Sequence, residues 1–392
     1  MPTPLHIAHL TPSLNTTAGG LSRVVLGLAR AQMNLGCQVT VHVLESDTPA
    51  ADFPFRVVQN RPIGPAQIGY SPTLLQQLVD SKPDVIHSHG LWTYTSYASH
   101  VASRSLAVPH VCSPHGMLDA WALKQFRAMK TVFSAAFQRR ALQQAGCLHA
   151  LTEAERDSIR AYGVATPTAV VANGIDDALL TVDKVDAKKA FFDRFSHLRG
   201  QRIALFLSRI HPKKGLINLL NVWKQLASHT ENWHLVIAGP DEGGHEAEIA
   251  AEVERLGITS GVSLIGVQQG AEVWECYAAA DLFLLPSFSE GFSMAVLEAL
   301  AFECPVCITT ECHFPEVEQV GGGLICEPTH ESLAQALSTL LEMSPENRQA
   351  MGQRGRALIE SRFTWKQVSM QHLAVYHWLR DKSLPIPKFV QS

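Results

Sequence analysis

Short apolar runs and amphipathic stretches alternate along the chain from its first residues onward. An apolar run over residues 5–10 predicts a buried strand, and residues 21–35 repeat apolar positions with the period of a helix that ends at Gly36. Another apolar run occupies residues 37–44. A strand, a helix and a second strand in this order predict a βαβ unit with parallel strands.

The same order returns in the second half of the chain. Residues 202–207 and 233–239 are apolar runs on either side of a helical pattern over 216–227, and further apolar runs cover 261–266 and 281–286. Strands that alternate with helices in this way form parallel sheets with helices on their faces. We therefore expect an α/β protein with two doubly wound parallel sheets.

The two sheets imply two domains. A length of 392 residues suits two or three domains of about 150 residues each, and 46% apolar with 17% charged residues is the composition of a folded globular chain. Residues 170–172 run into an Asn-Gly turn at 173–174, which a charged stretch follows. We expect domains at 1–172 and 173–364, with a ligand bound between them.

Charge and targeting signals narrow the cellular setting. Residues 1–172 hold 13 Lys and Arg and 9 Asp and Glu, whereas the remainder holds 19 and 27, so the net charges are +4 and −8. This asymmetry suggests an anionic partner for the N-terminal half, or is compositional scatter. The N-terminus lacks the basic start and apolar core of a signal peptide, and the sequence has no apolar run of about 18 residues. We expect a cytoplasmic protein, at most peripheral on the inner face of the membrane.

Two glutamates lie where the last of these apolar runs meets a helical pattern. Glu290 follows the run 281–286, Gly291 makes a turn, and residues 293–302 predict a core helix that carries Glu298 about two turns in. The carboxylates would lie about 12 Å apart along the helix rise, too far to share a proton. At the strand end of an open α/β sheet they could hold two parts of a long ligand, with helix-terminal amides at a phosphate between them. A nucleotide sugar fits this description; the alternative is one capping glutamate and one solvated glutamate.

A basic loop and three histidines are further candidates for ligand contacts. Arg209 and Lys214 could together bind a diphosphate, or could belong to a solvated loop. His115 ends an apolar strand at a His-Gly turn, where it either contacts a ligand or is structural. His87 and His89 share one face of a strand, which invites a metal site. Without a third ligand at a suitable spacing, we expect both to line a cleft or pack in the core.

Four cysteines in the C-terminal half suggest either metal or redox chemistry, or buried structural thiols. Cys304 and Cys307 flank a Pro-Val pair, and Cys312 and Cys326 follow. Residues 305–309 are typical of a strand, in which residues three apart point to opposite faces, so the thiols would not converge. We expect structural thiols.

Motifs spread over nearly the whole chain resemble one enzyme family. The sequence resembles the retaining glycosyltransferases of the GT-B fold, in particular family 4, in which two Rossmann-like domains face a cleft. Each motif alone is weakly specific, whereas the full set in this order is strongly specific. The motifs are Gly19-Gly20, His115-Gly116, Asn173-Gly174-Ile175-Asp176, Arg209 with Lys214-Gly215, Ala238-Gly239-Pro240, Gly266, and Glu290 with Glu298.

The resemblance implies roles for these residues. Arg209 and Lys214 would bind the diphosphate as its charge grows, Glu298 would hold the ribose hydroxyls, and Glu290 would hold the donor sugar, which His115 would face. Backbone groups would complete the donor site: the amides of Gly291, Phe292 and Ser293 at the sugar, Gly266 and Val267 at the base, and Gly19 and Gly20 at the phosphates.

The implied activity is transfer of a sugar from a nucleotide diphosphate sugar to a hydroxyl acceptor, with retention of configuration. The sequence contains no Asp-x-Asp triplet, which argues against a metal-dependent GT-A transferase, so we expect no metal and no other cofactor. No nucleic acid partner is expected. The alternatives are another GT-B enzyme, such as a sugar-nucleotide epimerase, and a non-catalytic subunit that binds a nucleotide sugar. Glu303 stands where the family has a glycine. Glycine at this position lets the preceding helix end in a left-handed turn, so Glu303 makes that local geometry uncertain.

Two helical patterns bear on the acceptor and on the domains. Residues 121–140 could dock on an anionic membrane that carries a lipid-linked saccharide acceptor, or could pack in the core with a basic rim. The pattern over 113–124 resembles bacterial transferases of surface-polysaccharide assembly, and residues 365–382 resemble the family's last helix, which joins the N-terminal domain. The apolar side of the 121–140 helix carries Phe126, Met129, Phe133 and Phe137, flanked by Lys124, Arg127 and Lys130.

Overall fold

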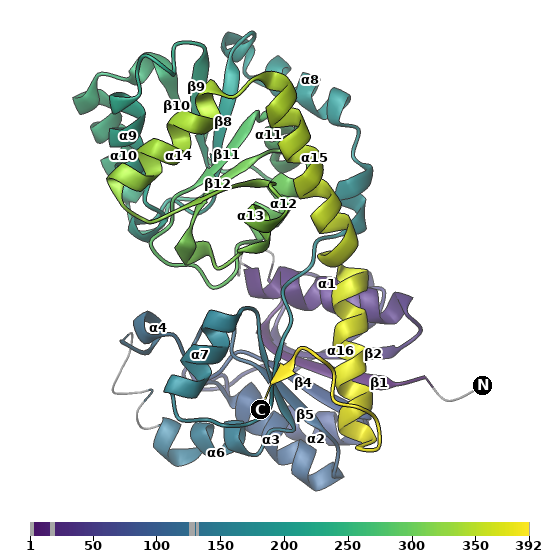
Figure 1. Ribbon diagram of the computed structural model, residues 1–392. Helices are drawn as coiled ribbons and strands as arrows, with labels where there is room; N and C mark the ends of the chain where they lie inside the picture. Colours follow the sequence, from purple (N-terminus) through teal and green to yellow (C-terminus); the bar gives the residue numbers. More distant parts are fainter. Residues whose placement is uncertain (1–3, 16–19, 125–129, 131–132, 392) are drawn as a thin grey trace. The chain divides into compact units, whose positions relative to one another are not determined.

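The computed structural model describes residues 4–15, 20–124, 130 and 133–391, and it divides into two compact units (Figure 1). The N-terminal unit comprises Met1–Gly174 and Trp365–Ser392, and the C-terminal unit comprises Ile175–Thr364. The last helix, α16 (Trp365–Arg380), packs against α1 (Gly20–Asn34) of the N-terminal unit.

The sheet of the N-terminal unit has the strand order β14-β7-β6-β5-β4-β1-β2-β3, in which only β14 runs antiparallel to its neighbour among the described strands. Its strands are β1 (His6–Ser13), β2 (Gln38–Glu45), β3 (Arg56–Gln59), β4 (Val85–His89), β5 (His110–Ser113), β6 (Cys147–Ala150), β7 (Thr168–Val170) and β14 (Val390–Gln391). Besides α1 and α16, its described helices include α2 (Leu74–Asp80), α3 (Tyr94–Leu106), α4 (Ala120–Lys124), α6 (Arg139–Gln143) and α7 (Glu153–Ala161).

The sheet of the C-terminal unit has the order β10-β9-β8-β11-β12-β13, with every described neighbour parallel. Its strands are β8 (Arg202–Leu207), β9 (Trp233–Ala238), β10 (Val262–Leu264), β11 (Leu282–Leu285), β12 (Val306–Thr309) and β13 (Gly323–Cys326). Its helices include α8 (Lys184–Arg194), α9 (Leu216–Gln225), α10 (His245–Leu256), α11 (Ala271–Ala279), α12 (Met294–Ala301), α13 (Glu316–Gln319), α14 (His330–Glu342) and α15 (Pro345–Arg362).

The structure confirms the predicted architecture of two doubly wound parallel sheets. β8 has the bounds predicted from its apolar run, and β1, β9 and β11 differ from theirs by at most three residues at either end. All residues of β4 and β11 are buried, because helices cover both faces of a parallel sheet. Continuous apolar runs, instead of alternating ones, were therefore the correct signal for these strands.

Each sheet has one point where the direction of its connections reverses. In the N-terminal unit, β1 continues to β2 and β3 on one side, whereas β4 continues to β5, β6 and β7 on the other. In the C-terminal unit, β8 continues to β9 and β10, and β11 continues to β12 and β13. Ligands of open α/β sheets bind beyond the carboxyl ends of the strands at such a switch point. The pairs β1/β4 and β8/β11 are therefore the places to look for function.

The described residues of the region expected as one helix over 121–140 are all helical. They include α4, a π-helical segment over Ser134–Gln138, and α6 directly after it. Phe126, Arg127 and Met129 lie outside the described residues. Phe133 packs against the apolar core of the N-terminal unit, which favours the core-packing interpretation for this part. None of the helices that the structure describes has the length and hydropathy needed to cross a bilayer.

Glu303 adopts the left-handed conformation for which glycine was expected. Its φ is +59°, and its carboxylate forms ion pairs with Lys184 at 2.6 Å and with Arg356 at 3.8 Å. A non-glycine residue in this conformation costs about 1–2 kcal/mol. The helix that carries Glu298 nevertheless ends in the left-handed geometry, and the two ion pairs hold the side chain that replaces glycine.

Candidate active site

The loop after β8 approaches the end of β11 so closely that only glycine fits between them. Gly215 has a φ of +74°, and a Cβ atom at this position would lie 2.1 Å from the carbonyl oxygen of Pro286. The backbone N–H of Phe288 donates to the carbonyl of Lys213 at 2.7 Å. These contacts bring the basic loop against the segment that leads into α12.

Lys214 and Glu290 form a buried ion pair at this point. Their side chains are only 6% and 9% exposed, and the hydroxyl of Ser287 donates to Oε1 of Glu290 at 2.6 Å. Two charges in a buried place remain stable only when they are paired and hydrogen-bonded. The pair lies beyond the carboxyl ends of β8 and β11, which is the switch point of this sheet.

A second close glycine contact joins the ends of β8, β9 and β10. A Cβ atom on Gly239, whose φ is +138°, would lie 1.9 Å from the carbonyl oxygen of Ser208. The N–H of Gly239 donates to the carbonyl of Gly266 at 2.9 Å. Gly266 is itself in the left-handed region, and Val267 after it is 51% exposed. The structure therefore brings Gly266 and Val267 to the same sheet edge as Lys214.

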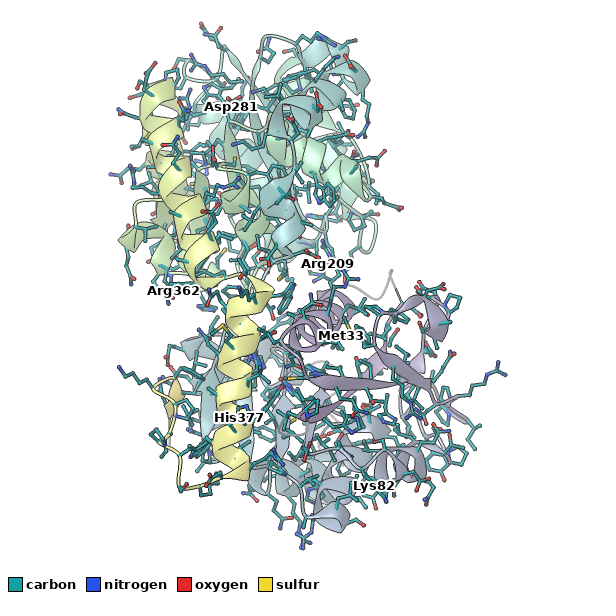
Figure 2. All side chains as sticks on the ribbon, turned by 90° about the vertical axis from the view of Figure 1, so that its right-hand side faces the viewer. Met33, Lys82, Arg209, Asp281, Arg362 and His377 are labelled. Atoms are coloured by element: carbon teal, nitrogen blue, oxygen red, sulfur yellow. The ribbon has the colours of Figure 1, made fainter. Side chains whose placement is uncertain are left out.

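Arg209 does not share a partner with Lys214. It is an exposed residue of the β8–α9 loop and pairs with Glu242. In Figure 2, Arg209 lies at the opposite end of the C-terminal unit from Asp281, which precedes β11, and this places Arg209 at the carboxyl edge of the sheet. Glu242 was missed in the sequence, where it is one of many acidic residues without a distinguishing pattern.

Glu298 is buried and is not the solvated helix residue that one interpretation expected. It lies in the second turn of α12 and is 5% exposed. The hydroxyl of Tyr277, from α11, donates to its Oε2 at 3.0 Å. Before this helix, Phe292 packs against Phe314 with ring centroids 5.4 Å apart. Gly291, Phe292 and Ser293 thus form the link from Glu290 to the helix.

In the N-terminal unit, a buried carboxylate holds the turn that carries His115. His115 follows β5 with a φ of +54°, and Gly116 has a φ of +74°. Glu155 Oε1 accepts from the N–H of Gly116 at 2.6 Å, and its Oε2 accepts from the N–H of Leu151 at 2.7 Å. Burial raises the pKa of Glu155 to about 7. Gly20 is the first residue of α1, and Gly19 lies outside the described residues.

The importance of Glu155 was missed in the sequence, although a signal exists there. Thr152 caps α7, and its hydroxyl oxygen accepts from the N–H of Glu155 at 3.1 Å. A Thr followed three positions later by Glu is the sequence pattern of a capping box. In a capping box the glutamate turns back to its own helix terminus. Glu155 does this with Oε2, at the N–H of Leu151, and its Oε1 also reaches the His115–Gly116 turn.

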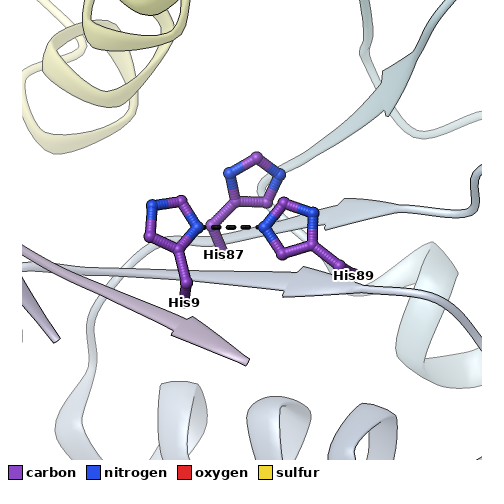
Figure 3. Close-up of side chains that lie close together, drawn as sticks. All are labelled: His9, His87 and His89. Carbon is purple, nitrogen blue, oxygen red and sulfur yellow. Dashed lines mark hydrogen bonds between the residues drawn. The ribbon is translucent and has the colours of Figure 1, made fainter. Parts of the chain in front are cut away.

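The expectation that His87 and His89 lack a third potential ligand is wrong. His9 of β1 pairs in register with His87 of β4, and the nitrogens of His9, His87 and His89 come within 4.8 Å of one another (Figure 3). A second group of this kind joins His87 to His149 and His372. Burial lowers the pKa of His9 to about 4 and those of His87 and His89 well below 6.5.

The four cysteines singled out in the C-terminal half are buried. Burial raises the pKa of Cys312 to about 12 and that of Cys304 well above 9. Within the described residues, neither group with metal-ligand spacing contains a cysteine. Cys304, Cys307, Cys312 and Cys326 are all buried, which fits the expected structural role, and a side-chain hydrogen bond with Cys307 lowers the pKa of Cys326.

Two family descriptions match separate parts of the chain. Residues 188–358 match Glycosyl transferases group 1, and residues 19–174 match the Glycosyl transferase 4-like domain. The first match lies within the C-terminal unit, and the second lies within the N-terminal unit.

Individual relatives agree with these matches. The chain is 27% identical to the alpha-maltose-1-phosphate synthase of Mycolicibacterium smegmatis over 74% of this chain and 78% of that protein. It is 23% identical to the GDP-mannose:cellobiosyl-diphosphopolyprenol alpha-mannosyltransferase of Xanthomonas oryzae pv. oryzae over 99% of this chain and 100% of that protein. The structure of Anabaena HepE in complex with UDP-glucose aligns with a TM-score of 0.75 at 19% identity, covering 97% of this chain and 100% of that one.

Two parallel-sheet units with these structural neighbours define the GT-B fold. The chain belongs to the glycosyltransferases, with a 4-like N-terminal unit and a group 1 C-terminal unit.

Proposed function

We propose that this glycosyltransferase moves a sugar from a nucleotide diphosphate sugar to a hydroxyl acceptor. The buried pair of Lys214 and Glu290 at the switch point of the C-terminal sheet is the observation that carries this proposal. The ammonium has three N–H donors, so it can bind a phosphate oxygen as well as Glu290. It would then stabilise the charge that grows on the departing diphosphate, while Glu290 lies at the sugar.

The remaining donor contacts follow from the same edge of the sheet. Arg209 would exchange Glu242 for a phosphate oxygen, and Glu298, oriented by Tyr277, would accept hydrogen bonds from the ribose hydroxyls. Other groups complete the proposed donor site: the amides of Gly291, Phe292 and Ser293 at the sugar, Gly266 and Val267 at the base, and, from the N-terminal unit, Gly19 and Gly20 at the phosphates and His115 at the sugar.

Transfer with retention of configuration fits the state of Glu290. Its Oε1 already contacts the ammonium of Lys214 and accepts from the hydroxyl of Ser287, so this oxygen is not placed to take a proton from an acceptor hydroxyl. The departing diphosphate would take the acceptor's proton instead. The bond from the anomeric carbon to the phosphate oxygen breaks, the bond to the acceptor oxygen forms on the same face, and the proton passes to the phosphate.

A bacterial polysaccharide or glycolipid is the acceptor that we favour. The Xanthomonas relative acts, by its name, on a cellobiosyl-diphosphopolyprenol. The N-terminal unit holds 17 Lys and Arg against 10 Asp and Glu, whereas the C-terminal unit holds 15 against 26. A basic unit suits docking on an anionic membrane surface that carries a lipid-linked acceptor. The enzyme would then act as a peripheral protein on the cytoplasmic side.

Product analysis tests this function. A thermal-shift screen of nucleotide diphosphate sugars would identify the donor, and mass spectrometry and NMR would identify the first product. We expect free nucleotide diphosphate and a glycoside with the donor's anomeric configuration. An inverted anomeric centre would contradict retention, an isomerised donor would favour an epimerase, and binding without turnover would favour a non-catalytic subunit.

Glu290→Gln tests the role of the buried pair. The variant keeps the size of the side chain and loses its charge, so turnover should fall by about 100-fold or more while donor affinity changes little. Glu254→Gln, which removes an exposed carboxylate of α10 in the same unit, is the control and should keep most of the turnover. Equal turnover in the Glu290 variant and the parent would make Glu290 a structural residue.

We also propose that transfer needs no metal ion, because Lys214 and Arg209 supply the positive charge at the diphosphate. Turnover should survive EDTA. A loss that manganese restores would contradict this and would direct attention to the histidine groups of the N-terminal unit.

A further inference from the structure

A continuous chain of buried hydrogen bonds in the N-terminal unit ends at His115. Its members are five histidines, two further side chains with hydroxyl groups and one amide. In order, the contacts are His115 Nε2 to His89 Nδ1 (3.1 Å), His89 Nε2 to His9 Nδ1 (2.9 Å), His9 Nε2 to Gln32 Oε1 (2.8 Å), Gln32 Nε2 to Tyr376 Oη (3.3 Å), Tyr376 Oη to His87 Nδ1 (2.6 Å), His87 Nε2 to Ser113 Oγ (2.7 Å), Ser113 Oγ to His149 Nδ1 (2.7 Å) and His149 Nε2 to the Val171 carbonyl (2.7 Å). Figure 3 shows the link between His9 and His89, with His87 beside it.

The Val171 end fixes the direction of these hydrogen bonds. A carbonyl can only accept, so Nε2 of His149 carries a proton, and in a neutral ring its Nδ1 must then accept. Ser113 therefore donates to His149 and accepts from Nε2 of His87, whose Nδ1 accepts from the hydroxyl of Tyr376.

The same direction continues to the other end. Tyr376 accepts from the amide of Gln32, which leaves the Gln32 oxygen to accept from Nε2 of His9. His9 then accepts at Nδ1 from His89, and His89 accepts at Nδ1 from His115. The result is a proton on Nε2 of His115 and a lone pair on its Nδ1.

The neutral state that this reasoning requires agrees with the burial of the rings. Burial lowers the pKa of His9 and His149 to about 4 and that of His115 to about 3. It lowers those of His87 and His89 well below 6.5. Each ring thus has one N–H donor and one acceptor near neutral pH, as a chain with a single direction needs.

We infer that this chain sets the tautomer of His115, so that Nδ1 is a hydrogen-bond acceptor for a hydroxyl of the bound donor sugar. The inference rests on the proposed function, in which His115 contacts that sugar. His115 is only partly buried, and its Nδ1 has no hydrogen-bond partner among the residues that the structure describes. Gln32, Tyr376 and Ser113 are positioning residues, because they are buried and act through His115.

A metal ion is the competing explanation for so many close histidines. However, both ring nitrogens of His9, His87, His89 and His149 already have hydrogen-bond partners in the chain. The rings of His87 and His89 are also stacked, with centroids 4.3 Å apart and planes at 29°. Stacked rings point their nitrogens side by side and not toward one ion, so the hydrogen-bonded chain fits the geometry better.

Nitrogen-15 NMR of the histidine side chains in the full-length protein tests the tautomer directly. Signals of His115 are identified by their loss in His115→Ala. We expect a protonated Nε2 and an unprotonated Nδ1 in the parent, and a mixture of tautomers in Tyr376→Phe and in Gln32→Met, which cut the chain while keeping the side-chain volume. His110→Gln is the control, because His110 is buried in β5 and is hydrogen-bonded to Ser88, which is not a member of the hydrogen-bonded chain that ends at His115.

A double-mutant cycle tests whether the chain acts on the ligand. Tyr376→Phe should weaken donor binding about 2- to 10-fold, the value of one neutral hydrogen bond, although Tyr376 is four hydrogen bonds away from His115. In a His115→Ala background it should have no further effect, because the residue through which it acts is gone.

Three results would overturn the inference: a proton on Nδ1 of His115 in the parent, additive effects of Tyr376→Phe and His115→Ala, or stoichiometric zinc in the purified protein together with loss of the histidine N–H signals. If no nucleotide sugar binds, the proposed function fails, whereas the NMR measurement still decides the tautomer. The two failures are therefore distinguishable.

Discussion

The two units place different kinds of polar group at the same point of the same architecture. At the switch point of the N-terminal sheet, β1 and β4 carry neutral histidines that satisfy one another's hydrogen bonds. At the switch point of the C-terminal sheet, the loops after β8 and β11 carry a buried ion pair. A neutral network can fix a geometry, whereas a buried pair of full charges creates a strong local field. In the proposed function, the first unit would orient a hydrogen bond and the second would stabilise developing charge.

This difference extends through both units. Buried histidines of the N-terminal unit are His6, His9, His42, His87, His89, His110, His149 and His372, against His234 and His245 in the C-terminal unit. A buried neutral histidine resists protonation, so it couples folding to pH. The two units should therefore respond differently to acid.

The largest expected effect is unfolding of the N-terminal unit in mild acid. The pKa values of its buried histidines fall from 6.5 to about 4 for His9 and His149 and to about 3 for His110. The unfolded chain then binds more protons as pH falls below 6.5, so stability is lost between pH 6.5 and about 4. At pH 5 each such histidine lowers the free energy of unfolding by about 2 kcal/mol relative to neutral pH. Several together approach the whole free energy of unfolding of a typical domain.

Calorimetry from pH 7 to pH 5 would check this, with pulse proteolysis and mass spectrometry to identify the unit that opens. In the C-terminal unit, burial lowers the pKa of His234 to about 4, so its transition should move less. Equal shifts of both transitions, or earlier cleavage in the C-terminal unit, would contradict the expected difference in acid stability between the two units.

The second effect concerns nucleotide diphosphate binding by the C-terminal unit. Lys214→Ala should weaken it by about 3 kcal/mol and Arg209→Ala by about 1.5 kcal/mol, the range for charged hydrogen bonds. Lys214 is buried, whereas Arg209 is half exposed and must leave Glu242. Titration calorimetry measures both.

Two controls keep this interpretation specific. Lys213→Ala in the same loop should leave the affinity nearly unchanged. Because Lys214→Ala leaves Glu290 without its partner, the double variant with Glu290→Gln separates loss of the phosphate contact from that uncompensated charge. Unchanged affinity in both the Lys214 and Arg209 variants would show that neither side chain binds the diphosphate.

Glu155 should respond to pH with the opposite sign from the histidines. Its pKa is raised from 4.5 to about 7, so the folded state binds its proton more tightly than the unfolded state. This stability is present below pH 4.5 and is lost as pH rises to about 7. Relative to Glu155→Gln, the parent should therefore gain about 2 kcal/mol between pH 7 and pH 5.5. Denaturant unfolding at the two pH values measures this; a constant difference would exclude titration of Glu155.

The smallest expected effect is at the membrane. Changing Lys124, Arg127 and Lys130 to Ser should reduce binding to anionic vesicles by about 1 kcal/mol per residue at most. Lys130 contributes less because its ammonium donates to the Ala122 carbonyl at 2.6 Å. Sedimentation with anionic and with neutral vesicles, the latter as control, decides the matter. Equal sedimentation of variant and parent would leave this region to core packing.

Much of the fold and part of the site could be predicted locally. Continuous apolar runs predicted β8 and the other central strands, because a strand covered by helices on both faces is buried along its whole length. Gly215 marked the loop at which a side chain would meet Pro286, and the basic loop and the glutamates were correctly assigned to a strand edge. Glu155 was missed because its capping pattern hides a long-range contact with Gly116.

By itself, the sequence determined which segments become strands and helices and which residue types stand at the strand ends. Only the tertiary structure decided the partners: Lys214 pairs with Glu290, Arg209 pairs with Glu242, and His9 is hydrogen-bonded to His89, 80 positions away. The reason is that the local pattern of apolar residues indicates which segments are buried, whereas the partner of each side chain depends on the order of the strands in the sheet. In each sheet the chain adds two strands on one side of the first strand and then crosses to its other side. This crossover places β4 beside β1 and β11 beside β8.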